Sequence, residues 1–389
     1  MKKTLLVTSV LAGLSLVAGP TGERPNETHA WSVHDPNRPD PVKISVPANG
    51  IPSDAIVLFD GTQASVDRNW SALDGSPTKW TVKDGELVCT PGSGMVQTKM
   101  PFEDCQLHVE WKTPKDDLYG WGNSGVFLGA AYEIQILDSF EIPARELFRP
   151  ANYADGQAGA IYGQSPCLVN PSRATGEWQS FDVVFHPPRF EGERMLDPGD
   201  MTIFYNGVLV QDCWKFEGPT HWNRRAKLEP ISYQPAQPLR LQDHGHPVPF
   251  RNIWIRRIPS RLANTTAGGP HVKKGDVAAL RHRLAGESLA FAEKESDPAA
   301  KFIRLWESYC YEPDRAVKSK IGPATTALVA AVKAKDERAV SSERAVTLQR
   351  FLKMLEKEGF LPDAGELGKL IDATVAEHQR PKAPHLRDL

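Results

Sequence analysis

The sequence predicts a mainly β protein, a jelly-roll β-sandwich that is followed by an α-helical extension. Between residues 54 and 259, short runs rich in Val, Ile, Trp, Phe and Tyr alternate with turn signals. No helical pattern interrupts these runs, and two stacked antiparallel sheets are the economical way to bury them. After Pro259 the apolar residues follow the periodicity of amphipathic helices, which predicts the extension.

The expected strands are short and closely spaced. Lys83-Asp84-Gly85 and Asn206-Gly207 mark two tight hairpins, because Asp-Gly and Asn-Gly accept the positive φ that such turns need. Two connections, Asp138 to Gln157 and Phe216 to Gln237, exceed hairpin length and are expected to wall one face of the sandwich. In chain order, the predicted strands are Ile56–Phe59, Lys79–Val82, Glu86–Cys89, Gly94–Gln97, Cys105–Lys112, Ser124–Leu128, Tyr132–Leu137, Gly159–Tyr162, Gln179–His186, Met201–Tyr205, Val208–Gln211, Leu239–Gln242 and Ile253–Ile258.

The helical extension is predicted from residues that typically begin helices. It contains no cluster of catalytic residue types, so we expect it to dock on the sandwich or to contact a protein partner. In order, the helix-start signals are Asp276, Asp297-Pro298, Gly322-Pro323, Ser341-Ser342-Glu343 and Asp363.

The N-terminus has the pattern of a signal peptide. Met1-Lys2-Lys3 forms a basic region, and Leu5 to Ala18 forms an apolar region that is too short to span a bilayer comfortably. We therefore expect an exported protein, periplasmic or secreted, with no membrane span after signal removal. In order, the predicted organisation is a signal peptide at 1–18, a flexible leader at 19–53, the sandwich at 54–259, a linker at 260–275 and the helical extension at 276–389.

Composition and charge exclude several classes of partner and cofactor. The 389 residues include 46 basic and 48 acidic side chains, and the formal net charge of -2 provides no field that would attract nucleic acid or an anionic membrane. The five cysteines lack C-x-x-C spacing, which argues against a zinc cluster. No organic cofactor is expected.

The stretch from Ala131 to Ser139 is the centre of the predicted site. As a strand, it places Glu133 and Gln135 on one face of a sheet and Ile134 and Ile136 on the other. A carboxylate and an amide backed by isoleucines are what a strand lining a sugar-binding groove needs.

Seven motifs are distributed over this region. In order, they are VLFDG at Val57–Gly61, WTVKDGELVC at Trp80–Cys89, NSGVFL at Asn123–Leu128, YEIQILD at Tyr132–Asp138, AIYG at Ala160–Gly163, GEWQSFDVVF at Gly176–Phe185 and RLQDHGHPVPFRNIWIRRI at Arg240–Ile258. Together they resemble the motifs of the DUF1080 family, the 3-keto-disaccharide hydrolases, which combine 3-keto-glucoside 1,2-lyase and 3-keto-2-hydroxy-glucal hydratase activities on a concanavalin-like jelly roll. The resemblance covers about residues 54 to 259.

The resemblance implies elimination and hydration of an oxidised, 3-keto glycoside or oligosaccharide. The ketone acidifies the proton on C2, so a base can remove it, after which the oxygen on C1 leaves and water adds. Such chemistry needs a base, an acid and either hydrogen-bond donors or a cation near the developing enolate. A divalent metal ion is a tentative part of this expectation.

Glu133 is the first choice for the base and His244 for the general acid or base. Each also has a structural alternative, an outer-face glutamate and a turn histidine. The expected substrate-binding residues are Gln135, Asn123, Ser124, Tyr162, Gln242, Trp222 and Arg251, and the tentative metal ligands are Glu133, Asp138, Asp243 and His244.

The spacing of Glu133, Gln135 and Asp138 also resembles the E-x-D-x-x-E pattern of laminarinase-like glycosidases. Five residues of extended strand cover roughly 16 Å, whereas a retaining pair of carboxyl groups lies about 5–5.5 Å apart. Conventional hydrolysis is therefore a weaker alternative to elimination. A noncatalytic carbohydrate-binding module is the other alternative, because the same groove and aromatic residues could only hold a sugar.

Overall fold

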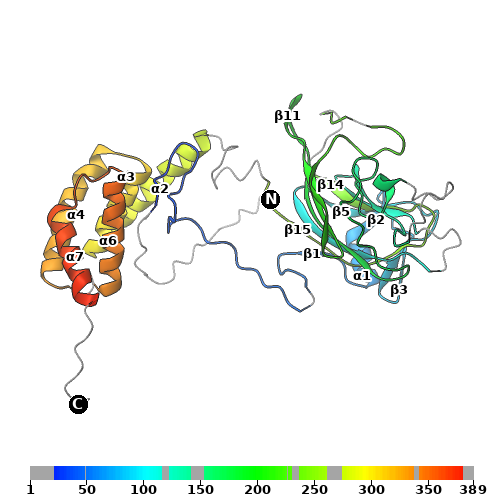
Figure 1. The fold of residues 1–389 in the computed structure, drawn as a ribbon, viewed down its shortest axis with the longest axis horizontal. Helices are drawn as coiled ribbons and strands as arrows, with labels where there is room; N and C mark the ends of the chain where they lie inside the picture. Colours follow the sequence, from blue (N-terminus) through cyan, green and yellow to red (C-terminus); the bar gives the residue numbers. More distant parts are fainter. Residues whose placement is uncertain are drawn as a thin grey trace, which may run out of the picture. The chain divides into compact units, whose positions relative to one another are not determined.

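The computed structural model describes residues 22–48, 50–115, 122–141, 153–225, 227–229, 236–260, 274–336 and 341–379. The chain forms two compact units. The β unit comprises residues 43–260 and is drawn mainly in cyan and green, and the helical unit combines residues 1–42 with residues 261–389 (Figure 1). The expected signal peptide at 1–18 lies outside the described residues. Export stays a prediction, which the N-terminal residue of the mature protein would check.

The β unit contains two main antiparallel sheets and a small ribbon. The eight-stranded sheet has the order β13 (Val208–Lys215), β12 (Asp200–Tyr205), β9 (Gln179–His186), β6 (Cys105–Trp111), β15 (Pro249–Arg257), β4 (Glu86–Val88) and β3 (Thr81–Lys83), with β1 (Ile56–Phe59) also pairing with β15. The five-stranded sheet has the order β2 (Trp70–Ala72), β5 (Val96–Phe102), β14 (Gln237–Leu241), β7 (Ser124–Leu128) and β8 (Tyr132–Ile136). The ribbon is β10 (Arg189–Glu191) with β11 (Arg194–Asp197).

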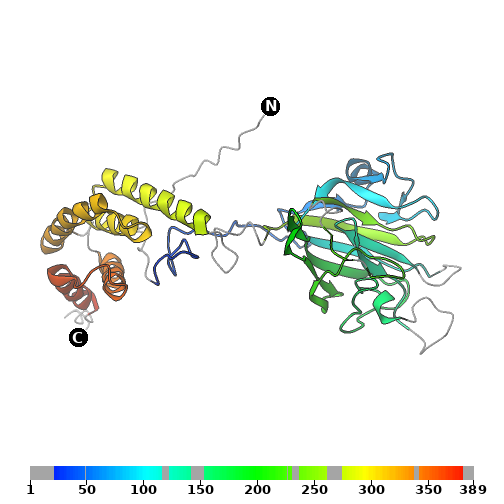
Figure 2. The same ribbon diagram turned by 90° about the horizontal axis from the view of Figure 1, so that it is seen from above.

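Alternating side chains from both sheets form one apolar core. Leu107, Val109 and Trp111 of β6 and Ile134 and Ile136 of β8 belong to it, and each is at most 1% exposed. The residues between them point away from this core, as the period of two requires. The predicted class, a mainly β sandwich with a helical extension, is confirmed, and Figure 2 shows the long strands of the β unit running side by side.

The two predicted hairpins are present. Asp84 and Asn206 both have positive φ, of 53° and 50°, and each precedes a glycine that also has positive φ. The predicted strand at Gly159–Tyr162 is wrong, because only isolated bridges form there, at Ile161. The alternation of that segment is too short to specify pairing. β2 and the β10–β11 ribbon were not predicted from the sequence.

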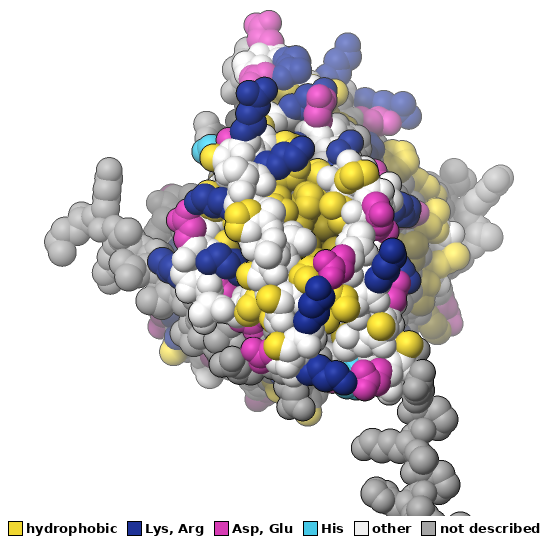
Figure 3. Space-filling model, turned by 90° about the vertical axis from the view of Figure 1, so that its left-hand side faces the viewer, with side chains coloured by type: hydrophobic (Ala, Val, Ile, Leu, Met, Phe, Trp, Pro, Cys, Tyr) yellow, Lys and Arg dark blue, Asp and Glu magenta, His cyan; other side chains and the backbone are white. Residues whose placement is uncertain are grey.

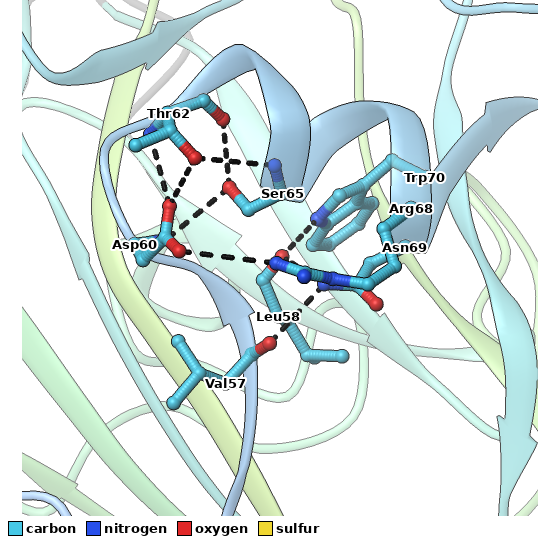
Figure 4. A network of polar contacts seen from close by, with 8 residues as sticks. All are labelled: Val57, Leu58, Asp60, Thr62, Ser65, Arg68, Asn69 and Trp70. Atoms are coloured by element: carbon cyan, nitrogen blue, oxygen red, sulfur yellow. Dashed lines mark hydrogen bonds and ion pairs between the residues drawn. The ribbon is translucent and has the colours of Figure 1, made fainter.

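A short helix, α1 (Gln63–Asn69), joins β1 to β2 and was also not predicted. Thr62 is its N-cap, and the Thr62 hydroxyl accepts a hydrogen bond from the Ser65 amide. At the other end, Asn69 and the Trp70 indole donate to backbone carbonyls of β1, including that of Leu58 (Figure 4). The VLFDG motif therefore has a structural role, since it connects β1 to the start of the five-stranded sheet.

The described part of the helical unit contains α2 (Lys274–Lys294), α3 (Pro298–Tyr311), α4 (Arg315–Lys333), α6 (Ser342–Lys357) and α7 (Gly365–Gln379). The predicted cap of α3 is confirmed, since Asp297 accepts hydrogen bonds from two amides of the first turn. The predicted start of α4 at Gly322-Pro323 is wrong. The Asp314 side chain caps that helix at the Val317 amide, and Pro323 lies inside it.

Part of the expected leader belongs to the helical unit, which its composition did not indicate. Ala30 lies in a small apolar cluster with residues of α2 and with Tyr311. The Tyr311 hydroxyl donates to Asp35 at 2.7 Å, and Asn37 donates to the same hydroxyl at 3.1 Å. Residues 22–48 contain no helix or strand, yet these contacts attach the segment before residue 43 to α2 and α3.

Apolar side chains also reach the surface of the helical unit. Figure 3 shows hydrophobic side chains gathered near the middle of one face, among Lys, Arg, Asp and Glu. A cavity of about 550 Å³ is lined by residues that include Phe302, Trp306 and Leu367. None of the described helices combines the length and apolar character needed to cross a membrane. The expected protein partner of this unit stays a prediction.

Candidate functional site

Glu133 and Gln135 lie on the face of β8 that points away from the core. Both are nearly inaccessible, with 5% and 3% of their surface exposed, while Ile134 is fully buried in the core on the opposite face. The predicted alternation along this strand is therefore present. We call this side of the five-stranded sheet the polar face.

Gly125 provides the space that the Glu133 carboxyl group occupies. In the register of β7 and β8, Gly125 lies opposite Gln135, and Phe127 lies opposite Glu133. A Cβ atom on Gly125 would overlap Glu133 Oε1 and would lie 3.1 Å from Glu133 Cδ. Any larger residue at position 125 would displace the carboxyl group.

Burial controls the protonation of Glu133. Desolvation alone raises the pKa of this carboxyl to about 8. Among the described residues, no hydrogen bond or ion pair reaches its oxygens. Burying a carboxyl group without a protein partner lowers the stability of the folded state. Such a group is a candidate for binding a ligand, and the raised pKa of Glu133 suits a general base near neutral pH.

The edge of β8 is covered by two connecting segments. The Glu133 amide donates to Thr220 Oγ1 at 3.1 Å, and the Tyr162 amide donates to the Glu133 carbonyl oxygen, also at 3.1 Å. The Tyr162 hydroxyl lies 3.2 Å from that of Tyr153, and burial raises the pKa of Tyr162 above its usual range. Trp222 follows Thr220 by two residues and is 78% exposed. Tyr162 therefore contacts β8 through its own backbone, and Trp222 lies two residues from Thr220, which also contacts β8.

Amide side chains accompany Glu133 on the polar face. Gln135 Nε2 donates to Asn123 Oδ1 at 3.2 Å. Gln242 follows β14 directly, and its backbone amide donates to the Gly125 carbonyl oxygen at 2.9 Å. The Oε1 atom of Gln242 is buried and has no hydrogen-bond partner among the described residues. The structure thus brings Glu133, Gln135, Asn123 and Gln242 to one region beside Gly125.

Ser124 does not belong to this region. It pairs with Ile136 in the register of β7 and β8, so its side chain shares the core side of the sheet. It is fully buried, and its hydroxyl donates to the Gln242 carbonyl oxygen at 2.7 Å. The prediction that Ser124 binds substrate is corrected, because the period of two places it on the face opposite Gln135.

Arg251 also lies elsewhere. It is on β15 of the eight-stranded sheet, where its Nε donates to Glu110 at 2.6 Å and its guanidinium lies 4.0 Å from the centre of the Trp178 ring. The neighbouring Asn252, with φ of 45°, donates to Glu110 and lies at a shift in strand register. The structure corrects the prediction that Arg251 belongs with Glu133.

Asp138 and Asp243 are held by protein groups. The Thr175 hydroxyl donates to Asp138 at 2.5 Å, beyond the end of β8. The Asp243 carboxylate accepts from the amides of Gly94 and Gly245. Burial would raise the pKa of Asp243, but the hydrogen bonds of these amides outweigh it and lower the pKa. Asp243 thus closes the turn after β14.

His244, one residue further, is exposed and stacks at a ring-centre distance of 6.4 Å on His246. No described contact joins His244 to Glu133 or Gln135. Gln242 is the first residue after β14, and His244 lies two residues further along the chain.

The residues do not fit the tentative metal site. Asp138 and Asp243 are occupied by Thr175 and by backbone amides, and His244 has no described contact with Glu133. Within the described ranges, no three His, Cys, Asp or Glu side chains are arranged to hold a metal ion. We therefore assign no step to a metal.

Arg240 was not singled out from the sequence, and Gly125 was expected to bring exposed backbone close to a ligand, not to make room for a carboxyl group. Gly125 lies in the NSGVFL motif, and Arg240 begins the segment that contains Gln242 and His244. Alternation along Pro238–Gln242 could have placed Arg240 beside Gln242, but only strand order places either residue near Glu133.

Comparison with known proteins gives one family and several similar structures. The family described as 3-keto-alpha-glucoside-1,2-lyase-like domain matches residues 54–256. A crystal structure from Parabacteroides distasonis ATCC 8503, described as a "putative glycosyl hydrolase", is 35% identical, with a TM-score of 0.50, and covers 57% of this chain and 93% of its own. A second structure from that organism with the same description is 20% identical, has a TM-score of 0.40 and covers 53% of this chain and 94% of its own. No curated protein matches the chain.

Proposed function

Since the chain belongs to the 3-keto-alpha-glucoside-1,2-lyase-like family through residues 54–256, we propose that this carbohydrate-active protein is an enzyme that cleaves 3-keto glycosides by elimination and hydration. The observation that carries the proposal is the Glu133 carboxyl group, which is buried above Gly125 without a described partner and shares the polar face with amide side chains.

Glu133 would act as the base. A ketone at C3 makes the C2 proton acidic, and the carboxylate removes this proton to form an enolate. The electron pair then expels the oxygen at C1, which requires a proton as it leaves. Water adds to the resulting double bond and completes the hydration. Because burial raises the pKa of Glu133 to about 8, its basicity is greater than that of an ordinary carboxylate.

The amide groups would orient the sugar and stabilise the enolate. Gln135, Asn123 and Gln242 offer both donors and acceptors, and the unpaired Oε1 of Gln242 can accept a hydrogen bond from a sugar hydroxyl. Tyr162 would donate a hydrogen bond from its phenol, because its raised pKa keeps the oxygen protonated. The exposed Trp222 ring would stack on a sugar face.

His244 would supply the proton to the leaving oxygen. It is exposed and lies just beyond Gln242, so it could exchange protons with solvent. His244→Ala is expected to lower kcat for a glycoside with a poor leaving group by about a hundredfold, and to affect an activated aryl glycoside much less, because that leaving group needs little protonation. Steady-state kinetics on both substrates measures this. An equal loss on both would rule out the acid role, and full activity on both would exclude His244 from the reaction.

The proposal is tested by incubating the purified full chain with a 3-keto glucoside, with and without a chelator. Release of the aglycone, followed by formation of the hydrated keto sugar, supports the enzyme. Turnover of the unoxidised glycoside would instead support conventional hydrolysis. The exposed Trp222 favours a second candidate, a carbohydrate-binding module, which predicts binding of the sugar without turnover.

A further inference from the structure

Arg240 lies on the polar face, two strands away from Glu133. It pairs with Phe127 of β7, and Phe127 pairs with Glu133 of β8, so the three residues form one row across the sheet. Its neighbours Leu239 and Leu241 are in the core, which confirms that Arg240 points to the opposite side. Two strand spacings separate the backbones of Arg240 and Glu133 by about 10 Å.

Arg240 lacks a carboxylate partner among the described residues. Its Nε donates to Gln97 Oε1 at 3.3 Å and its Nη1 to the Ala130 carbonyl oxygen at 3.4 Å, and both are long contacts to neutral acceptors. On the other sheet, Arg251 and Arg256 each pair with a carboxylate, at 2.6 Å. A partly buried guanidinium with only neutral partners retains the capacity to bind an anion.

Glu133 is not the counter-ion of Arg240. A guanidinium close to a carboxylate lowers the carboxyl pKa, whereas the pKa of Glu133 is raised by burial and by no other group. The two residues therefore define separate positions on the same face. If Glu133 reaches C2 of the oxidised sugar, a group linked to C1 that extends along this row would reach Arg240, about 10 Å away.

We propose that Arg240 binds a carboxylate on the leaving group of the glycoside, with Gln97 orienting the guanidinium. This inference rests on the proposed function and adds a substrate class to it: 3-keto glycosides whose aglycone or second sugar is anionic. A planar guanidinium recognises a carboxylate through two parallel hydrogen bonds, which a neutral group of the same shape cannot reproduce.

The test compares two nearly isosteric substrates, the 3-keto glucosides of 4-hydroxybenzoate and of 4-hydroxybenzamide, each as both anomers. For each protein we take the ratio of kcat/KM for the carboxylate over the amide, which cancels general effects on activity. Arg240→Gln is expected to lower this ratio by about ten- to hundredfold, mainly through KM. Arg240→Lys should retain part of it. Arg256→Gln, which removes one positive charge from the other sheet, is the matched control and should leave the ratio unchanged. A 3-keto disaccharide with a terminal uronate tells whether an anionic sugar or an aryl carboxylate is preferred.

An unchanged ratio in Arg240→Gln would overturn the inference and leave the proposed function intact. If wild-type protein turns over neither substrate, the proposed function fails instead. In that case calorimetric binding of the two keto glucosides to wild-type and Arg240→Gln proteins still decides the inference, since only a carboxylate site loses its preference for the acid. Added salt should weaken binding of the carboxylate substrate more than that of the amide.

Discussion

Glu133→Gln is expected to lower kcat/KM on a 3-keto glucoside by at least a thousandfold, within the range that a general base contributes. The substitution keeps the size of the side chain and removes the group that accepts the C2 proton. Because the carboxyl group is buried above Gly125, the variant places an amide at that position and does not open it to solvent. Initial rates with the purified variant measure the loss, and circular dichroism checks that the fold is intact.

Glu110→Gln is the matched control for this variant. Glu110 is also a partly buried glutamate, but it lies on the eight-stranded sheet and binds Arg251 and Asn252. The Glu110→Gln protein should be less stable than wild type and should keep the wild-type turnover. If Glu110→Gln is inactive while Glu133→Gln retains full rate, the site has been assigned to the wrong sheet.

The raised pKa of Glu133 also predicts how its variant responds to pH. The pKa of this carboxyl is about 8 in the folded state and near 4.5 in the unfolded chain, so the folded state holds the proton more tightly. The Glu133 carboxyl group therefore makes the free energy of unfolding depend on pH. Its contribution is fully present below pH 4.5, falls by about 1.4 kcal/mol per pH unit above that, and is lost once the pH has risen through 8. The Glu133→Gln protein has no carboxyl group at this position, so its free energy of unfolding does not fall in this way. In denaturant unfolding, the variant should be as stable as wild type near pH 5 and more stable than wild type near pH 9. Wild-type kcat/KM should rise toward pH 8, because the base acts only when it is unprotonated.

Gly125→Ala is expected to reduce kcat/KM about a hundredfold while the protein remains folded. The new Cβ would overlap Glu133 Oε1, and the carboxyl group is the end of a flexible side chain that can move away. Gly125 is not among the described glycines with positive φ, so the effect would come from lost space and not from backbone strain. The measurement is kcat and KM together with a thermal unfolding curve.

A second substitution tests this explanation. Glu133→Asp shortens the carboxylate and should restore part of the space that Gly125→Ala removes. The double variant should then be more active than the product of the two single losses predicts, as a double-mutant cycle would reveal. Strict additivity, or full activity of Gly125→Ala alone, would mean that the position of the carboxyl group is not set by Gly125.

Local patterns were sufficient where a residue's neighbours along the chain decide its environment. The alternation from Tyr132 to Ile136 predicts which side chains enter the core, and both Asp-Gly and Asn-Gly turns are present as hairpins. The start of α4 failed for a related reason. A proline is an ordinary first residue of a helix, so Gly322-Pro323 predicted a start there, whereas the helix begins after the Asp314 cap.

Residues from different strands could not be sorted in this way. Ser124 and Arg251 have suitable side chains and lie within motifs of the family, yet one faces the core and the other lies on the second sheet. Arg240 was overlooked although it is two residues before Gln242. Strand order, and not composition, decides which of these side chains lie on the same face as Glu133.

The amino-acid sequence alone determined the class of the fold, the polar side of β8 and the family, because a period of two and ordered motifs are properties of contiguous residues. Only the tertiary structure decided that Gly125 makes room for Glu133, that burial raises the carboxyl pKa and that Arg240 shares the polar face without a described carboxylate partner. These features depend on the order β14, β7, β8, in which β14 and β7, more than 100 residues apart in the chain, become neighbours through backbone hydrogen bonds.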